Sequence, residues 1–181
     1  IPLEWTDEVF VPFDYGYFAF VYDAQSLETP PASFEELIAL PEDFKIVIQD
    51  PRSSTPGLGL ILWIKALYGD DAISIWEGLA PHVLTVTSGW SESYDLFLSG
   101  EADMVLSYTT SPAYHLIAEG ENRYHAAKFE AGHYTQIEVA GILASSPNQE
   151  LAQQFLAYLV TPEGQATLPE TNWMYPVLEP T

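Results

Sequence analysis

The sequence predicts an α/β fold in which helices cover a largely parallel sheet. Short runs of β-branched and aromatic residues alternate with longer segments of helical period, which is the pattern of strand-helix-strand units. Four pairs of a hydroxyl residue and proline separate these segments: Thr55-Pro56, Ser111-Pro112, Ser146-Pro147 and Thr161-Pro162. With 48% hydrophobic residues in 181 positions, the chain can bury a sizeable core.

The N-terminal part begins with a predicted long strand. Val9 to Asp23 is rich in aromatic and β-branched residues, with a bend expected at Gly16. Ser33 and Glu36 have the spacing of a capping box, in which each side chain satisfies a backbone N–H at a helix start. They predict a short helix that ends at Leu40.

Three shorter strands follow, at Phe44 to Gln49, His82 to Thr87 and Met104 to Tyr108. Ser91 to Ser99 is predicted to be helical and to stop at Gly100. In each of the four proline pairs the hydroxyl residue is predicted to be the N-cap, with proline in the first helical turn.

The C-terminal part is predicted to form a strand and an amphipathic helix. The strand covers Tyr134 to Leu143 and is expected to lack neighbours within the chain. The helix carries an apolar stripe at helical spacing, which we expect to be uncovered: Leu151, Phe155, Leu156 and Leu159. Such a stripe predicts that the chain associates with another polypeptide.

The charge of the chain excludes two classes of partner. Five basic residues stand against 26 acidic ones, for a formal net charge of -21. Nucleic acids and anionic membranes both require clusters of Lys and Arg, so neither is expected as a partner. The charge fits solubility in general, or attraction of a cationic ligand. There is no Cys, and the longest apolar stretch, Leu58 to Ala66, is shorter than the roughly 20 residues of a membrane span.

Motifs for catalysis and for metal binding are absent from the sequence. Gly57 to Leu62 lacks the last glycine of a dinucleotide motif, and Gly89 to Ser93 has Ser93 where a hydrolase elbow requires glycine. The histidines lack the paired spacing of metal ligands: His82, His115, His125 and His133. We therefore expect no enzyme, no catalytic residue, no metal and no cofactor.

Large aromatic residues lie instead beside polar loops at predicted strand ends: Trp90, Tyr108, Tyr114 and Trp173. Each of them alone is as well explained by core packing. Together they predict a site for a flat or cationic ligand, because ring faces attract positive charge. Ser54 precedes a helix N-terminus, where free N–H groups bind phosphate or are simply capped by Thr55.

Several strings closely resemble one known family: FVPFDYGYFAFVY from Phe10, QDPRSSTPGLGL from Gln49, LSYTTSPAYH from Leu106 and NWMYP from Asn172. The sequence resembles the periplasmic thiamine-binding proteins of ABC importers from about Phe10 to Val177. The resemblance implies a type II periplasmic binding protein, with one complete lobe, the hinge strands and the C-terminal part of the other lobe.

The resemblance also divides the chain and assigns its site. Residues 1–23 would form the first hinge crossing, residues 24–130 the ligand-binding lobe, and residues 131–181 the return strand with the C-terminal part of lobe one. By motif, the four aromatic residues above would surround thiamine, and Ser54 would lie near its phosphate. The implied function is capture of thiamine, thiamine monophosphate or thiamine diphosphate in the periplasm, for delivery to the ABC permease.

The family's N-terminal segment is missing here, so the implied partners include that segment as a separate polypeptide, or a second copy of the chain by domain swapping. Three other functions stay open: a binding protein for ferric ion or a polyamine, an enzyme on the same architecture, and an isolated lobe that acts only as an assembly unit.

Overall fold

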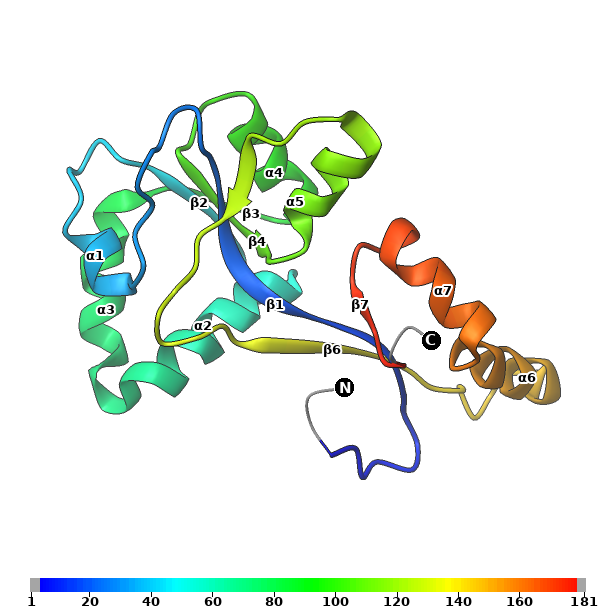
Figure 1. Cartoon of the computed structure of the whole chain (residues 1–181). Coiled ribbons are helices and arrows are strands. Elements are labelled where there is room, and N and C mark those ends of the chain that lie inside the picture. Colours follow the sequence, from blue (N-terminus) through cyan, green and yellow to red (C-terminus); the bar gives the residue numbers. More distant parts are fainter. Residues whose placement is uncertain (1–3, 179–181) are drawn as a thin grey trace. The chain divides into compact units, whose positions relative to one another are not determined.

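The computed structural model describes residues 4–178, which form two compact units (Figure 1). Among the described residues, unit 1 combines residues 4–16 with residues 135–178, and unit 2 comprises residues 17–134. The long strand β1 (Val11–Asp23) begins in unit 1 and ends in unit 2. The predicted long strand is confirmed, but it begins at Val11 rather than Val9 and continues through Gly16 without interruption.

The sheet of unit 2 has the strand order β3-β2-β4-β1-β5. Apart from β1, its strands are β2 (Ile46–Gln49), β3 (Val83–Thr87), β4 (Met104–Tyr108) and β5 (Tyr124–Ala126). β2 pairs in parallel with β3 and β4, whereas β1 runs antiparallel to β4 and β5. The sheet is therefore mixed, and the prediction of a largely parallel sheet is wrong for this half. Strand direction depends on the connections between strands, which residue alternation does not encode.

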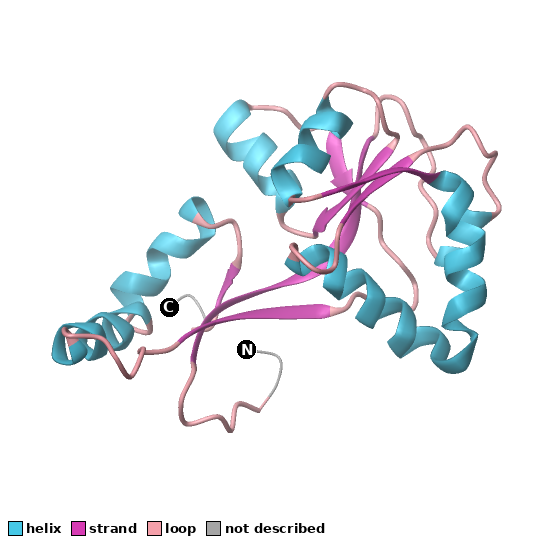
Figure 2. Cartoon of the chain, turned by 180° about the vertical axis from the view of Figure 1, so that it is seen from behind, coloured by secondary structure: helices cyan, strands magenta, loops and turns pink. Residues whose placement is uncertain are grey.

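Helices cover both faces of this sheet (Figure 2). They are α1 (Phe34–Ile38), α2 (Thr55–Tyr68), α3 (Ala72–Leu79), α4 (Trp90–Leu98) and α5 (Ser111–Tyr114), with a π-helical turn at His115–Glu119 and 3-10 turns at Gly69–Asp71 and Ala80–His82.

Alternation along the strands divides the core between the two faces. Phe20, Ile46 and Met104 join the core cluster that contains α1, α2 and α3. The next residue in each strand belongs instead to the cluster that contains α4: Val21, Val47 and Val105. Successive side chains of a strand point to opposite faces, so this period of two explains why both faces of the sheet are apolar.

The helix starts are near the predicted positions, but three of the four predicted N-caps are wrong. Thr161 is the N-cap of α7 (Pro162–Thr171), and its hydroxyl accepts from the N–H of Gly164 at 3.2 Å. For the other three helices the N-cap is a neighbouring residue: Ser54 for α2, Thr110 for α5 and Asn148 for α6 (Gln149–Leu159). The first four N–H groups of a helix have no helical partner, so proline fits several first-turn positions and does not fix the cap of α2 or α5. For α6 the predicted first-turn proline is also wrong, because Pro147 precedes the N-cap Asn148.

Two other local predictions are partly corrected. The Ser33 hydroxyl accepts from the N–H of Glu36 at 3.1 Å as predicted, but the Glu36 carboxylate accepts from Ala32 rather than Ser33, and α1 ends at Ile38. The strand predicted from His82 begins at Val83. His82 is buried in the preceding turn, with its ring nitrogens 3.0 and 3.2 Å from the carbonyl oxygens of Phe44 and Ile38.

Unit 1 contains the first part of β1, with β6 (Thr135–Ala140) and β7 (Tyr175–Pro176) both paired to it. The expectation that the strand after Tyr134 lacks neighbours is therefore wrong. α6 and α7 complete the unit. α6 has no buried residue, but its predicted stripe is only partly uncovered: Leu151 and Phe155 are 65% and 57% exposed, whereas Leu156 and Leu159 are half-buried. In the part of the chain that the structure describes, no helix is both long and apolar enough to cross a membrane.

Candidate functional site

The carboxyl ends of β2, β3 and β4, together with the segments that follow them, carry most of the predicted site residues. These three strands are parallel neighbours, so their carboxyl ends meet at one edge of the sheet. Ser54 follows β2, Trp90 follows β3, and Tyr108 and Tyr114 lie at and after the end of β4. The structure therefore collects four of the five predicted residues in unit 2.

The Trp90 side chain is held by the buried hydroxyl of Ser107. Its indole Nε1 donates to the Ser107 hydroxyl at 2.8 Å, and the side chain of Ser107 is fully buried. Ser107 in turn is 2.7 Å from the hydroxyl of Ser111, which also accepts from the N–H of Tyr108 at 3.3 Å. The Ser107-Ser111 pair therefore connects the Trp90 indole with the backbone of Tyr108, at the point where β4 leads into α5.

The Trp90 ring also packs on Tyr94, with ring centroids 4.8 Å apart, yet Trp90 remains 39% exposed. Tyr108 lies at the end of β4 opposite Phe18, and these two rings are 5.3 Å apart. Both predicted rings are thus fixed by the core on one side. Trp90 keeps enough exposed surface for a ligand to stack on it.

A buried polar chain supports Tyr114. The Tyr94 hydroxyl lies 2.9 Å from His115 Nε2, and His115 Nδ1 lies 2.7 Å from a Glu119 carboxylate oxygen. Burial raises the pKa of Tyr94, so its hydroxyl stays protonated near neutral pH. A carboxylate oxygen only accepts, so His115 donates from Nδ1 to Glu119. Tyr114 is 40% exposed and packs edge-on against His115 at 5.3 Å.

Ser54 is placed by the loop between β2 and α2. Its N–H donates to the carbonyl of Asp50 at 2.9 Å, and its side chain makes no capping hydrogen bond to α2. The N-terminal N–H groups of α2 therefore lack the side-chain cap that was predicted from Thr55. Such a terminus, in a helix of 14 residues, favours an anionic group.

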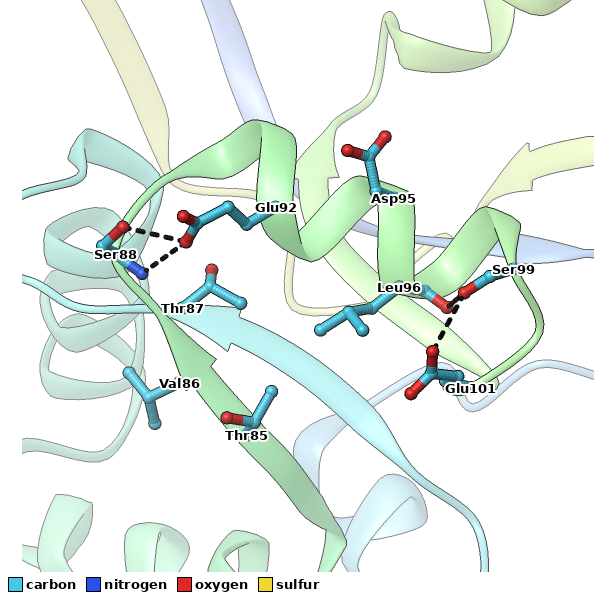
Figure 3. A pocket seen from close by; sticks show the side chains of 9 residues that line it. All are labelled: Thr85, Val86, Thr87, Ser88, Glu92, Asp95, Leu96, Ser99 and Glu101. Carbon is cyan, nitrogen blue, oxygen red and sulfur yellow. Dashed lines mark hydrogen bonds between the residues drawn. The ribbon is translucent and has the colours of Figure 1, made fainter.

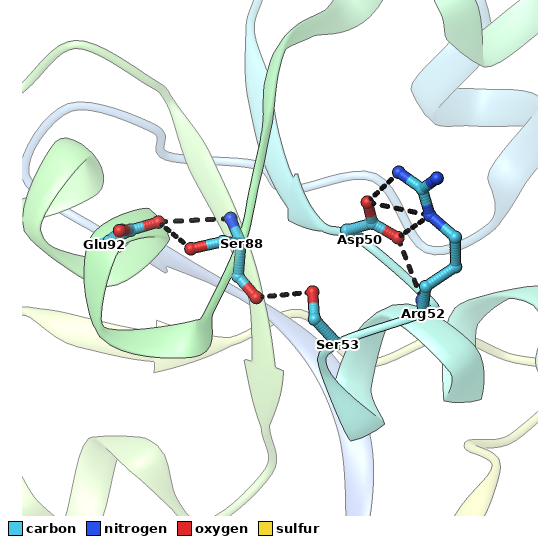
Figure 4. Close-up of polar contacts among 5 residues, drawn as sticks. All are labelled: Asp50, Arg52, Ser53, Ser88 and Glu92. Carbon is cyan, nitrogen blue, oxygen red and sulfur yellow. Dashed lines mark hydrogen bonds and ion pairs between the residues drawn. The ribbon is translucent and has the colours of Figure 1, made fainter.

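Two polar contacts fix the loop between β2 and α2 next to Ser54 (Figure 4). The Ser53 hydroxyl donates to the carbonyl of Ser88 at 2.8 Å, which ties the loop after β2 to the loop after β3. Arg52 Nε and Nη2 both donate to the Asp50 carboxylate, which lowers the pKa of Asp50 to about 2. This arginine is therefore already engaged by a carboxylate.

Trp173 belongs to unit 1, where it follows α7. Its φ is 57°, and among the described residues it is the one residue other than glycine with positive φ. The N–H of Trp173 donates to the carbonyl of Leu168 at 3.1 Å. The sequence predicted Trp173 as a site residue but carried no sign of this backbone conformation.

An open depression of about 670 Å³ lies along β3 and α4 and is lined by none of the predicted residues (Figure 3). Its acidic lining residues are Glu92, Asp95 and Glu101. Glu92 accepts from the N–H and hydroxyl of Ser88, and Glu101 accepts from the Ser99 hydroxyl at 3.5 Å. Among the described residues, no group of three or more His, Cys, Asp or Glu side chains is arranged to hold a metal ion.

Sequence reasoning missed the residues that hold the aromatic side chains, which are Ser107, Ser111, Tyr94 and His115. The one available signal was a serine inside the apolar strand MVLSY. A buried hydroxyl needs a partner, but the sequence does not show which side chain supplies it.

Comparison with known proteins assigns the family. Residues 2–166 match the model of the bacterial extracellular solute-binding proteins. The chain belongs to this family. It is 55% identical over 181 residues to the thiamine-binding periplasmic protein of Escherichia coli strain K12, which covers all of this chain and 55% of that protein. The corresponding protein of Haemophilus influenzae is 45% identical over 99% of this chain and 54% of its own length.

A solved structure of a periplasmic thiamin binding protein superposes on the whole chain with a TM-score of 0.96 at 55% identity, and the match covers 57% of that structure. The fructose-6-phosphate-bound periplasmic binding protein AfuA from Actinobacillus pleuropneumoniae matches with a TM-score of 0.80 at 20% identity, over 96% of this chain and 56% of that one. The second match shows a shared fold alone. The chain thus has the type II fold of the solute-binding family, and it spans little more than half the length of these relatives.

Proposed function

We propose that this chain is the larger part of a thiamine-binding protein that supplies an ABC importer in the periplasm. The observation that carries the proposal is the similarity to thiamine-binding periplasmic proteins, which extends over every residue of the chain. Binding and release of an unchanged ligand require no catalytic group, so the protein is not an enzyme. Its partners are thiamine or its phosphate esters and the membrane permease.

The ligand-binding residues are Trp90, Tyr108, Tyr114, Trp173 and Ser54. Thiamine carries two flat rings, one of them a cation, which matches aromatic side chains whose ring faces are electronegative. The hydroxyl pair below Trp90 and the packing of Tyr108 on Phe18 fix these rings before a ligand arrives. Rings that are fixed in advance lose little conformational entropy on binding.

Calorimetric titration of the native protein with thiamine tests this proposal. Trp90→Ala should weaken binding by about 1–3 kcal/mol, because large aromatic anchors dominate compact sites. The matched control is Trp76→Ala. Trp76 lies on α3 and packs against the core cluster that contains α1, α2 and α3, whereas Trp90 packs on Tyr94 of the other cluster. If the native protein binds a ferric salt or a polyamine but not thiamine, the proposal is wrong.

Ser54 is proposed to contact the phosphate of thiamine esters. The N-terminus of α2 favours anions, and the Ser54 side chain does not cap it. Ser54→Ala should therefore reduce the affinity for thiamine monophosphate more than the affinity for thiamine. An equal loss for both ligands would show that Ser54 has no phosphate-specific role.

The exposed face of α6 is proposed to pack against the remainder of lobe one. Leu151, Phe155 and Tyr158 are 65%, 57% and 48% exposed on this helix, an arrangement that is unusual for the surface of a monomer. Sedimentation equilibrium of the 181-residue chain, alone and with the N-terminal half of a thiamine-binding relative, tests this. Binding of that half is expected; a dimer of the chain alone would show domain swapping, and a monomer that ignores the added half would contradict the proposal.

A further inference from the structure

Asp14 is a buried carboxylate that the ligand-binding proposal does not use. It lies in the unit 1 part of β1 and its side chain is fully buried. Its Oδ2 accepts from the Asn172 amide at 2.6 Å, whereas its Oδ1 has no hydrogen-bond partner. A buried carboxylate with one unsatisfied oxygen lowers stability, so its presence calls for an explanation.

Trp173 lies between Asn172, which bonds the Asp14 side chain, and β7, which pairs with the strand that carries Asp14. The residue before it, Asn172, donates its side-chain amide to Asp14. Beyond Trp173, β7 pairs with β1 in a register that places Pro176 opposite Asp14 and Tyr175 opposite Tyr15. Asp14 therefore bonds the residue before Trp173, and the strand that carries Asp14 pairs with the segment after Trp173.

The turn itself requires support. Trp173 adopts a left-handed backbone, which is strained for a residue with a Cβ atom. The N–H groups of Asn172 and Trp173 both donate to the carbonyl of Leu168, at 2.9 and 3.1 Å. These two bonds end α7 but leave the direction of the following chain to the Asn172 side chain and to the pairing of β7.

We propose that Asp14 is a positioning residue for the ligand: through Asn172 it holds Trp173 in the left-handed turn that presents the indole. The inference rests on the proposed role of Trp173 in thiamine binding. The interaction is strongest when Asp14 is ionised, because a hydrogen bond to a charged acceptor is stronger than one to a neutral acceptor.

The surroundings of Asp14 make this interaction sensitive to pH. Burial raises the pKa of Asp14, the Asn172 hydrogen bond lowers it, and the nearby Glu138 on β6 raises it, so that the resulting pKa is about 6. The Glu138 carboxylate lies 3.4 Å from the same Asn172 amide and also accepts from Gln136. β7 places Pro176 opposite Asp14, and its Tyr175 ring packs on Tyr15. Among the described residues, no ion pair includes Asp14.

Two measurements on the native protein test the proposal. In ¹⁹F NMR with fluorotryptophan, the Trp173 resonance, assigned with Trp173→Phe, should titrate with a midpoint near pH 6. Asp14→Asn should abolish this titration and shift the resonance, while the Trp90 resonance serves as an internal control. Glu138→Gln should lower the midpoint. This measurement needs no ligand, so it tests the inference even if thiamine is not bound.

In calorimetry at pH 7.5, Asp14→Asn should weaken thiamine binding by about three- to tenfold, the usual effect of one hydrogen bond. The same variant should melt at an equal or higher temperature, because it removes a buried charge, and a merely structural role would lower both quantities together. Asp70→Asn, the same change at an exposed site, should alter neither. If Trp173→Ala loses affinity and Asp14→Asn does not, the positioning role is wrong and the thiamine site stands. If the Trp173 resonance in Asp14→Asn equals that of the parent, the proposal is also overturned.

Discussion

The two units differ in what holds them together. Unit 2 contains nearly all of the buried hydrophobic residues among those described, whereas unit 1 contributes Leu168 and Met174. The buried side chains of unit 1 are otherwise polar, namely Asp14 and Gln165. Unit 2 is therefore stabilised by apolar burial on both faces of a sheet, and unit 1 by a few specific hydrogen bonds.

This difference shows which part of the chain is self-sufficient. Apolar burial is the main favourable contribution to folding, and unit 2 has enough of it for a complete core. Hydrogen bonds contribute less net stability, but they define one geometry, because a missing partner is costly. Unit 1 therefore has a defined turn at Trp173 without a large core. The following experiments test this contrast, from the largest expected effect to the smallest.

Truncating one phenylalanine in each unit should have very different effects. Phe34 is fully buried on α1, and its ring packs on Phe20, Trp63 and Phe129 at 6.4, 5.0 and 5.0 Å. Phe34→Ala should lower the free energy of unfolding of unit 2 by about 3–5 kcal/mol. The matched change on α6, Phe155→Ala, should cost less than about 0.5 kcal/mol in the 181-residue chain. Urea unfolding followed by circular dichroism measures both, and equal losses would contradict the contrast.

Removing a buried amide tests whether unit 1 depends on specific hydrogen bonds. Gln165 donates to the carbonyls of Phe13 and Leu159 at 2.8 and 2.7 Å and accepts from the N–H of Val177 at 2.6 Å. Gln165→Ala removes these three hydrogen bonds, so it should destabilise unit 1 by about 1–3 kcal/mol. Faster hydrogen exchange at the amide of Val177 would report this loss. Gln154→Ala, at an exposed position of α6, is the control and should leave exchange unchanged.

The stability of the two units should change with pH in opposite directions. In unit 2, His133 Nδ1 lies 2.8 Å from the Phe18 carbonyl oxygen, and His133 Nε2 accepts from the N–H of Phe129. A ring nitrogen that accepts carries no proton, so this arrangement requires the neutral ring. Burial lowers the pKa of His133, so the unfolded chain binds more protons and unit 2 loses stability as pH falls below 6.5.

Asp14 has a raised pKa of about 6, so the folded state holds its proton more tightly and unit 1 gains stability as pH falls through 6 towards 4. Hydrogen exchange of amides in each unit at pH 7 and pH 5 checks both signs, after correction for the intrinsic exchange rate. His133→Gln should reduce the pH dependence of stability in unit 2, and Asp14→Asn should reduce the pH dependence of stability in unit 1. The same sign in both units would refute one of these assignments.

The sequence alone determined the alternation of strands and helices and the family resemblance that the comparisons support. Met104 to Tyr108 forms the predicted strand, and the helix predicted to stop at Gly100 ends at Leu98, with Gly100 at a φ of 80°. These features are local: residue alternation and a glycine in the left-handed region depend on a few consecutive residues. The aromatic site residues came from motifs and remain a proposal.

The tertiary structure decided what depends on residues far apart in the chain. Asp14 meets Asn172 across 158 positions and Trp90 meets Ser107 across 17, and no local pattern predicts either pair. The direction of β1 and the partition at residues 16 and 134 likewise follow from which strands pair. Hydrogen bonds and strand pairings of this kind form only once the whole chain has folded, because their geometry is set by packing rather than by propensity.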